Sequence, residues 1–175
     1  MTKFRPLDYV LAALMTAAGI FLMWENIVAG DDPSLIHQVE TRSWLIVPVF
    51  LLVTVPILWR RSNILAVVGA TLAATAIHVL AFGWLTRCGA VLPLSFALAY
   101  AIARFAPSRR DHLLSLAGVV VLLLITLWRD SSADIAGAMP IALPGAALFY
   151  GAGLLVQNRV NKKQQPVPAV ERATV

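Results

Sequence analysis

The chain has 175 residues, of which 59% are hydrophobic and only 13% are charged. A soluble domain carries roughly 25% charged residues, so this composition excludes an ordinary soluble globular protein. The net charge of +5 does not indicate a nucleic-acid-binding protein, because the basic residues stand in short segments between long apolar stretches. Such a pattern is typical of a protein that crosses a membrane several times.

Six apolar segments follow one another along the chain, each close to the roughly 17–25 residues that a helix needs to cross the hydrocarbon layer. The first begins after Lys3 and Arg5. Because it exceeds the roughly 7–15 apolar residues of a signal peptide, we expect it to be a retained span. The spans are predicted near residues 8–29, 43–59, 63–85, 88–105, 112–128 and 134–157. The sequence therefore predicts an all-α fold, with a six-transmembrane-helix bundle over residues 1–160 and a short disordered cytoplasmic tail over residues 161–175.

The distribution of Lys and Arg predicts the orientation of this bundle. If the amino terminus lies inside, the inner segments hold eleven of the fourteen basic residues, and the outer loops hold Arg42, Arg87 and Arg129. Cytoplasmic loops of membrane proteins carry the excess of positive charge, so we expect both termini in the cytoplasm. The abundance of Ala, Leu, Val and Arg suggests a GC-rich bacterium, and the predicted location is the bacterial plasma membrane.

Small residues at a spacing of four predict where the helices approach each other. In lipid, helices associate through close contact of small side chains. Three such pairs occur in the predicted spans: Ala13 and Ala17, Gly69 and Ala73, and Ala147 and Gly151. We expect these pairs to mark packing faces.

Two ionisable residues, Glu25 and His78, stand inside the predicted spans, where a charge is costly and often functional. Thr71, Thr75 and His78 share one helix face because they are separated by four and three residues. One interpretation couples Glu25 to His78 across the bundle, so that these four residues form a proton-sensitive or ligand-sensing site. In the other interpretation, Glu25 reaches the nearby membrane surface and His78 hydrogen-bonds to a neighbouring helix.

No motif indicates catalysis, a metal or a cofactor. His37, His78 and His112 fall in an outer loop, a span and an inner loop, so we do not expect them to converge on one ion. The single cysteine, Cys88, excludes an intrachain disulfide and lacks the partners of a zinc site. We therefore expect no catalytic residue, no cofactor and no enzymatic activity.

Three stretches of the sequence carry motifs known from one family. They are FRPLDYVLAALMTAAGI (residues 4–20), PILWRRSNILAVVGA (residues 56–70) and LSFALAYAIARFAPSRRDHLLSLAG (residues 94–118). The motifs are an Asp before the first span, Trp-Arg-Arg after the second, and Tyr-x-x-Ala-Arg before a basic loop. The residues that carry them are Asp8, Trp59, Arg60, Arg61, Tyr100, Ala103, Arg104, Arg109 and Arg110. Over roughly residues 4–160, the chain resembles the N-terminal membrane domain of actinobacterial sensor histidine kinases.

The resemblance implies a sensor-type membrane domain. The kinase core of that family, with its phosphoacceptor His and ATP-binding domain, is absent from the sequence. We therefore expect an accessory to, or a remnant of, a two-component signalling system, which passes its signal through another polypeptide such as a histidine kinase.

Two alternatives come from other classes of protein. One is a small transporter or channel subunit that works as an oligomer with further copies of itself. The other is a membrane scaffold whose basic inner residues contact anionic lipid, where each charge near the surface contributes about 1 kcal/mol. The candidate lipid contacts are Arg60, Arg61, Arg109 and Arg110. In every case we expect the lipid bilayer itself to be a partner.

Overall fold

The computed structural model of the protein describes residues 5–28 and 32–164, and every regular element in these ranges is helical. The elements are α1 (Pro6–Val28), α2 (Ile46–Thr54), the 3-10 helix η1 (Val55–Trp59), α3 (Ile64–Phe82), α4 (Cys88–Phe105), α5 (Arg109–Trp128) and α6 (Ile135–Gln164). The predicted all-α class is confirmed for this part of the chain.

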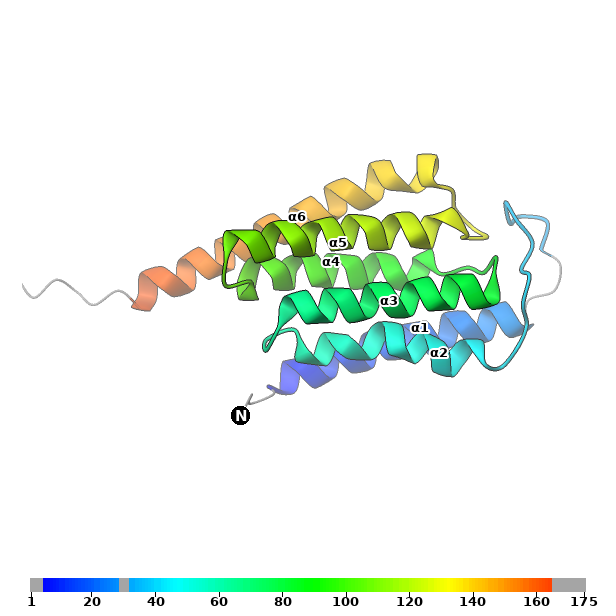
Figure 1. Ribbon diagram of the computed structural model, residues 1–175, viewed down its shortest axis with the longest axis horizontal. Coiled ribbons are helices and arrows are strands. Elements are labelled where there is room, and N and C mark those ends of the chain that lie inside the picture. Colours follow the sequence, from blue (N-terminus) through cyan, green and yellow to red (C-terminus); the bar gives the residue numbers. More distant parts are fainter. Residues whose placement is uncertain (1–4, 29–31, 165–175) are drawn as a thin grey trace, which may run out of the picture.

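The helices run side by side along the long axis of the molecule (Figure 1). α4 packs against α1, α3, α5 and α6, and its Leu94, Leu98 and Ile102 are completely buried. α1 begins and α6 ends at one end of the bundle, which we call the terminal end. The opposite end, which we call the loop end, carries the segments 32–45, 83–87 and 129–134.

Side-chain caps set where two of the helices begin. The Asn63 side chain accepts a hydrogen bond from Ala66 N at 3.0 Å where α3 starts. Ser108 Oγ accepts one from Asp111 N at 3.1 Å where α5 starts. Each cap satisfies a backbone N–H that has no partner inside its helix. The turns before α3 and α5 are therefore fixed by local sequence.

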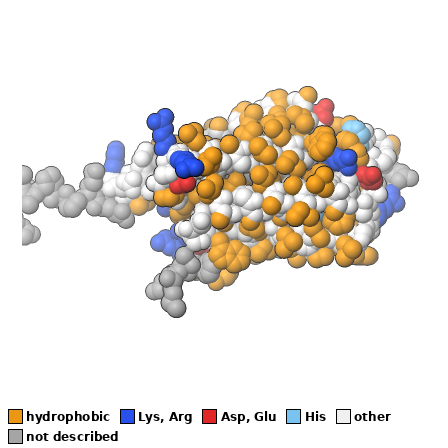
Figure 2. Space-filling model, viewed as in Figure 1, with side chains coloured by type: hydrophobic (Ala, Val, Ile, Leu, Met, Phe, Trp, Pro, Cys, Tyr) orange, Lys and Arg blue, Asp and Glu red, His pale blue; other side chains and the backbone are white. Residues whose placement is uncertain are grey.

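In the described part of the chain, five helices are long and apolar enough to cross a membrane: α1, α3, α4, α5 and α6. Leu80, Ile141 and Leu148 are 71%, 72% and 73% exposed, which would be unfavourable in water. In Figure 2, hydrophobic side chains cover the middle of the visible face, whereas charged side chains gather at the two ends. This apolar belt fits lipid contact and indicates a multi-pass membrane protein.

The predicted second span is short and divided. Its nine α-helical residues in α2 give way to the five residues of η1. Pro56, at the start of η1, has no N–H to continue the α-helical ladder. At roughly 1.5 Å per α-helical residue and 2.0 Å per 3-10 residue, the pair extends about 24 Å, less than the roughly 30 Å of the hydrocarbon layer. The six-span count and the orientation therefore remain predictions.

Close helix packing uses other small residues than the predicted pairs. A Cβ at Gly153 would lie 2.6 Å from a side chain of α4, and one at Gly145 would lie 2.7 Å from the Phe96 ring of α4. A Cβ at Gly69 or Gly151 would meet no atom within 4 Å. The alanines of the predicted pairs are all exposed: Ala13, Ala17, Ala73 and Ala147. The predicted packing faces are therefore wrong, because exposed small residues there face away from neighbouring helices.

α6 continues beyond the other helices at the terminal end (Figure 1). Its last turns carry Arg159, Lys162 and Lys163. Residues 161–164 of the predicted tail therefore belong to a helix. The rest of that predicted tail, 165–175, lies outside the described residues.

Candidate functional site

Arg87 is the centre of a polar network at the loop end. It immediately precedes α4, and its side chain is completely buried. Its Nε donates to Nδ1 of His78 at 3.0 Å, its Nη1 to the carbonyl of Arg129 at 2.8 Å, and its Nη2 to the carbonyl of Gly83 at 2.8 Å. The guanidinium therefore binds acceptors from α3, from the loop after α3 and from the end of α5.

Asp130 lies beside Arg87 and is also completely buried. Its Oδ2 accepts hydrogen bonds from the backbone N of Arg87 and of Cys88, both at 2.7 Å. Its Oδ1 accepts from the backbone N of Ser132 at 3.0 Å and from the Ser132 hydroxyl at 2.8 Å. The carboxylate thus caps the beginning of α4, where the helix dipole favours a negative charge.

Arg87 remains protonated although its side chain is buried. Burial lowers the pKa of Arg87 to about 10, and the nearby Asp130 carboxylate opposes that shift. A pKa of about 10 still leaves the guanidinium protonated at neutral pH. A buried charge persists only where hydrogen bonds and an opposite charge compensate it, and carbonyl groups and Asp130 provide both here.

His78 connects this network to α2. Its Nδ1 accepts from Arg87, so its Nε2 carries the proton and donates to the carbonyl of Ile46 at 3.2 Å. The rings of Phe50 and Phe82 lie 5.2 and 5.0 Å from the imidazole, measured between ring centroids. These contacts correspond to the interpretation in which His78 hydrogen-bonds to a neighbouring helix.

The predicted sensing residues are brought together only in part. Thr71, Thr75 and His78 share the buried face of α3. The Thr75 hydroxyl, however, donates to the Thr71 carbonyl at 2.8 Å rather than to the imidazole. Glu25 is exposed on α1, and among the described residues no hydrogen bond or ion pair joins it to His78. The two ring nitrogens of His78 are occupied by Arg87 and Ile46, so the proposed Glu25–His78 pair is not formed.

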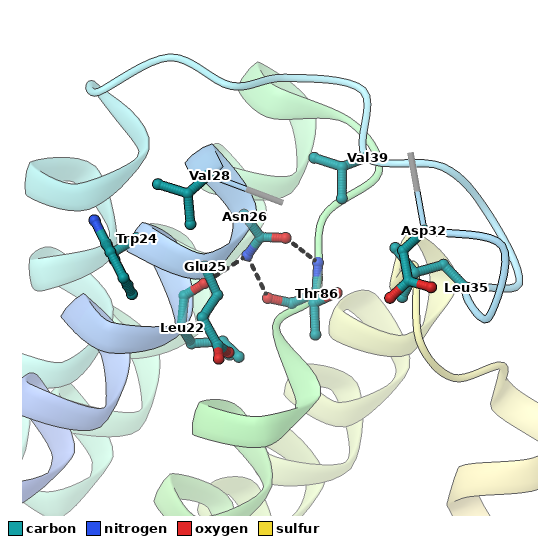
Figure 3. A pocket seen from close by; sticks show the side chains of 9 residues that line it. All are labelled: Leu22, Trp24, Glu25, Asn26, Val28, Asp32, Leu35, Val39 and Thr86. Carbon is teal, nitrogen blue, oxygen red and sulfur yellow. Dashed lines mark hydrogen bonds between the residues drawn. The ribbon is translucent and has the colours of Figure 1, made fainter. Parts of the chain in front are cut away.

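Glu25 instead lines a pocket of about 410 Å³ at the loop end. Figure 3 shows the hydrogen-bonded pair of Asn26 and Thr86, which joins α1 to the segment before α4 through two bonds of 2.9 Å. Asp32 also lines the pocket, and hydrogen bonds from Ser34 hold the pKa of Asp32 below its usual value. Glu25 and Asp32 together give the pocket an acidic rim.

The three segments of the loop end form one connected layer, which we call the loop layer. Glu40 N donates to the Trp84 carbonyl at 2.9 Å, and Trp84 N donates to Glu40 Oε2 at 3.0 Å. The His37 ring stacks on the Trp84 ring with 3.7 Å between centroids, and His37 N donates to the Ser131 carbonyl at 3.2 Å. Ser131 N in turn donates to the Leu85 carbonyl at 3.2 Å. Each segment of the loop layer is therefore joined by a direct hydrogen bond to each of the other two.

A second charged cluster lies at the terminal end, around the buried carboxylate of Asp8. Arg60 Nη2 donates to Asp8 Oδ1 at 2.6 Å, and Arg61 Nε donates to Asp8 Oδ2 at 2.8 Å. Arg60 and Arg61, predicted as lipid contacts, are therefore both engaged by Asp8, and Arg60 is only 7% exposed. The other two predicted contacts, Arg109 and Arg110, are exposed at the start of α5.

Neither Arg87 nor Asp130 is predicted from the sequence as a site residue. Arg87 is predicted only as a basic residue of an outer loop. The local signal for Asp130 is the serine two residues later, since an Asp at that spacing often closes an Asx-turn. Nothing in the sequence around Asp130 indicates that it meets residue 87.

No protein-family model, curated protein or solved structure matches the chain.

Proposed function

We propose that this chain is a membrane module of a two-component signalling system that acts on a histidine kinase through helix contacts in the bilayer. The observation that supports this most directly is the loop layer, whose segments are joined through Arg87 to the ends of α3, α4 and α5. A ligand or a physical change at that layer would act on several helices together. The family resemblance of the sequence points in the same direction.

The central position of α4 provides a route from the loop layer to the terminal end. Arg87 and Asp130 hold the beginning of α4, and α6 packs against α4 at Gly145 and Gly153. Packed helices shift as rigid elements rather than deform, so a displacement at the start of α4 would be carried along α6. α6 extends past the bundle with Arg159 and Lys162, where a kinase partner would be reached.

The interior of the bundle favours signalling over transport. A transport path needs polar groups through the middle of the bilayer. Here Leu98 and Leu123 are completely buried. The buried hydroxyls of Ser95 and Thr126 donate at 2.8 Å to carbonyls of their own helices. These two hydroxyls are satisfied within a packed apolar core, which supports signalling rather than transport.

The first experiment is a crosslinked affinity purification from native membranes, with a tag at the carboxyl end. Recovery of a histidine kinase or its response regulator, absent from untagged membranes, is the expected result. Recovery of the chain alone, followed by solute flux in proteoliposomes, would contradict the proposal and favour the transporter alternative.

A variant pair then tests the loop layer itself. Glu40→Leu removes the carboxylate that accepts from Trp84 N, and we expect it to change the autophosphorylation rate of the recovered kinase. Asp134→Asn is the matched control, because it removes one charge at the same end but keeps an oxygen that can accept from Gly137 N. Equal rates for wild type and Glu40→Leu would contradict the role of the loop layer.

A further inference from the structure

A groove at the terminal end is lined by arginines in one part and by apolar side chains in the other. It has a volume of about 590 Å³, within the roughly 300–1,000 Å³ of ligand pockets. Its cationic part is formed by Arg5, Arg60, Arg61 and Arg104, and no Asp or Glu lines it. The carboxylate of Asp8, which forms ion pairs with Arg60 and Arg61, offsets one of these four positive charges. The cluster therefore has a net charge of +3.

Two of these arginines retain unused donors inside the cluster. Arg60 Nη1 is buried and has no hydrogen-bond partner in the described part of the protein, although the neighbouring Nη2 is bound to Asp8. Arg104 Nε is likewise buried without a partner. Leaving a buried charged donor without a hydrogen bond is costly. An acceptor group of a bound ligand would therefore stabilise this cluster.

The arginines are held in place before any ligand arrives. The guanidinium carbons of Arg61 and Arg104 lie 4.9 and 5.7 Å from the centroid of the Phe105 ring. Arg61 is also fixed by the two oxygens of Asp8, at 2.8 and 2.9 Å from its Nε. Such an arrangement suits a phosphate, whose oxygens accept several N–H donors at once.

The apolar part of the groove follows α1 away from this cluster. Leu7, Val10 and Leu14 line it and are 69%, 52% and 59% exposed, so the groove is open along the flank of the bundle. From Leu7 to Leu14 it follows about 10 Å of helix axis toward the middle of the membrane. Phe149 of α6 lines the other side. A free phosphate would leave this part of the groove empty.

We infer that this groove binds an anionic phospholipid, with the phosphate on the arginine cluster and the first part of an acyl chain along α1. A cluster of positive charge between transmembrane helices at headgroup depth is the kind of site that holds such lipids. This inference differs from a diffuse attraction of exposed basic residues, because Arg109 and Arg110 do not line the groove. It also stands apart from the proposed signalling function.

The test uses the full chain, purified in a zwitterionic detergent and titrated with phosphatidylglycerol while native mass spectrometry counts the bound lipids. We expect one saturable phosphatidylglycerol site, no comparable site for phosphatidylcholine, and no competition by inorganic phosphate. Equal retention of phosphatidylcholine would overturn the inference. Displacement of the lipid by inorganic phosphate would also overturn it, because the site would then recognise the anion alone.

Variants locate the site. Arg5→Gln with Arg104→Gln removes two groove charges without breaking the ion pairs of Asp8, and we expect about fivefold weaker lipid binding per charge removed. Arg109→Gln with Arg110→Gln removes the same charge from the same end outside the groove, and its affinity should match wild type. Equal weakening in both pairs would show a nonspecific surface effect and contradict the site.

The apolar part is tested with Val10→Trp, which fills the groove from an exposed position and leaves every arginine in place. We expect the lipid affinity to fall by about tenfold while the thermal unfolding temperature in detergent stays close to that of wild type. Unchanged affinity with a folded variant would rule out the acyl-chain contact.

Discussion

At the scale of single residues, Arg87 shows how a charged side chain can be completely buried in a membrane protein. Its guanidinium donates to one imidazole nitrogen and to backbone carbonyls, and Asp130 supplies the opposite charge nearby. Each hydrogen bond to a charged group contributes roughly 1.5–3 kcal/mol, and loss of one partner leaves the others unsatisfied. The network is therefore expected to stabilise the loop end strongly.

Arg87→Gln tests this expectation. The glutamine is too short to keep the bonds to both the Arg129 and Gly83 carbonyls, and it removes the buried positive charge beside Asp130. We expect a loss of about 3 kcal/mol or more in the free energy of unfolding. The measurement is unfolding in mixed detergent micelles, followed by circular dichroism.

Arg129→Gln is the matched control for this variant. Only the side chain of Arg129 changes, and that side chain lies over the Trp128 ring at 5.5 Å, whereas its carbonyl still accepts from Arg87. A half-exposed contact of this kind contributes about 0.5–1 kcal/mol. Equal destabilisation by the two variants would mean that burial of Arg87 has no special energetic role.

The residues of this network also show what the sequence could and could not predict. His78 was identified because a lone ionisable residue in an apolar span is conspicuous. Arg87 and Asp130 were not, because each stands next to a span among other polar residues, and their burial depends on three segments that meet only in the folded protein. Local patterns contain no information about such long-range contacts.

At the scale of elements, the packing of α6 on α4 depends on two glycines. A Cβ at Gly153 would lie 2.6 Å from the Ala103 side chain and 2.7 Å from the Tyr100 carbonyl oxygen. Neither neighbour can move away easily, since one is a side chain of a single carbon and the other is backbone. The sequence pattern indicated Gly151 instead, because small-residue spacing alone does not reveal which face of an alanine-rich helix meets a neighbour.

Gly153→Ala and Gly151→Ala form a matched pair two positions apart on α6. Overpacking a close helix contact typically costs 1–3 kcal/mol, so we expect Gly153→Ala to lower the free energy of unfolding by about that amount. Gly151 has open space where its Cβ would lie, and replacing a helical glycine by alanine there should stabilise the helix by about 0.5–1 kcal/mol. The same unfolding measurement compares them, and a larger loss for Gly151→Ala would contradict the observed α4–α6 contact.

At the scale of the whole molecule, the location of the chain ends raises the question of how many times it crosses the membrane. The beginning of α1 and the end of α6 lie at the same end of the bundle, an arrangement that fits the predicted even number of crossings. Among the described residues five helices are long enough to cross, so the predicted count of six requires the short α2–η1 pair to cross as well. The apolar residues of this segment predict a span, and the proline at position 56 predicts an interruption within it, where η1 begins.

The charges at the two ends predict which side of the membrane each end faces. Among the described residues, the terminal end carries nine basic residues: Arg5, Arg60, Arg61, Arg104, Arg109, Arg110, Arg159, Lys162 and Lys163. The loop end carries three, and one of them, Arg87, is buried in its network. Because positive charge is retained on the cytoplasmic side, the terminal end should face the cytoplasm.

Single-cysteine labelling in intact cells tests the crossing of α2–η1 and the orientation together. In a Cys88→Ser background, Ser34→Cys at the loop end should react with a membrane-impermeant maleimide from outside. Ser62→Cys, just after η1, and Asn161→Cys, near the end of α6, should react only after the membrane is permeabilised; all three positions are exposed. If Ser62→Cys instead reacted from outside, α2–η1 would enter and leave on one side. The chain would then cross five times, and the ends of α1 and α6 would face opposite compartments, against the arrangement of the helices in the bundle.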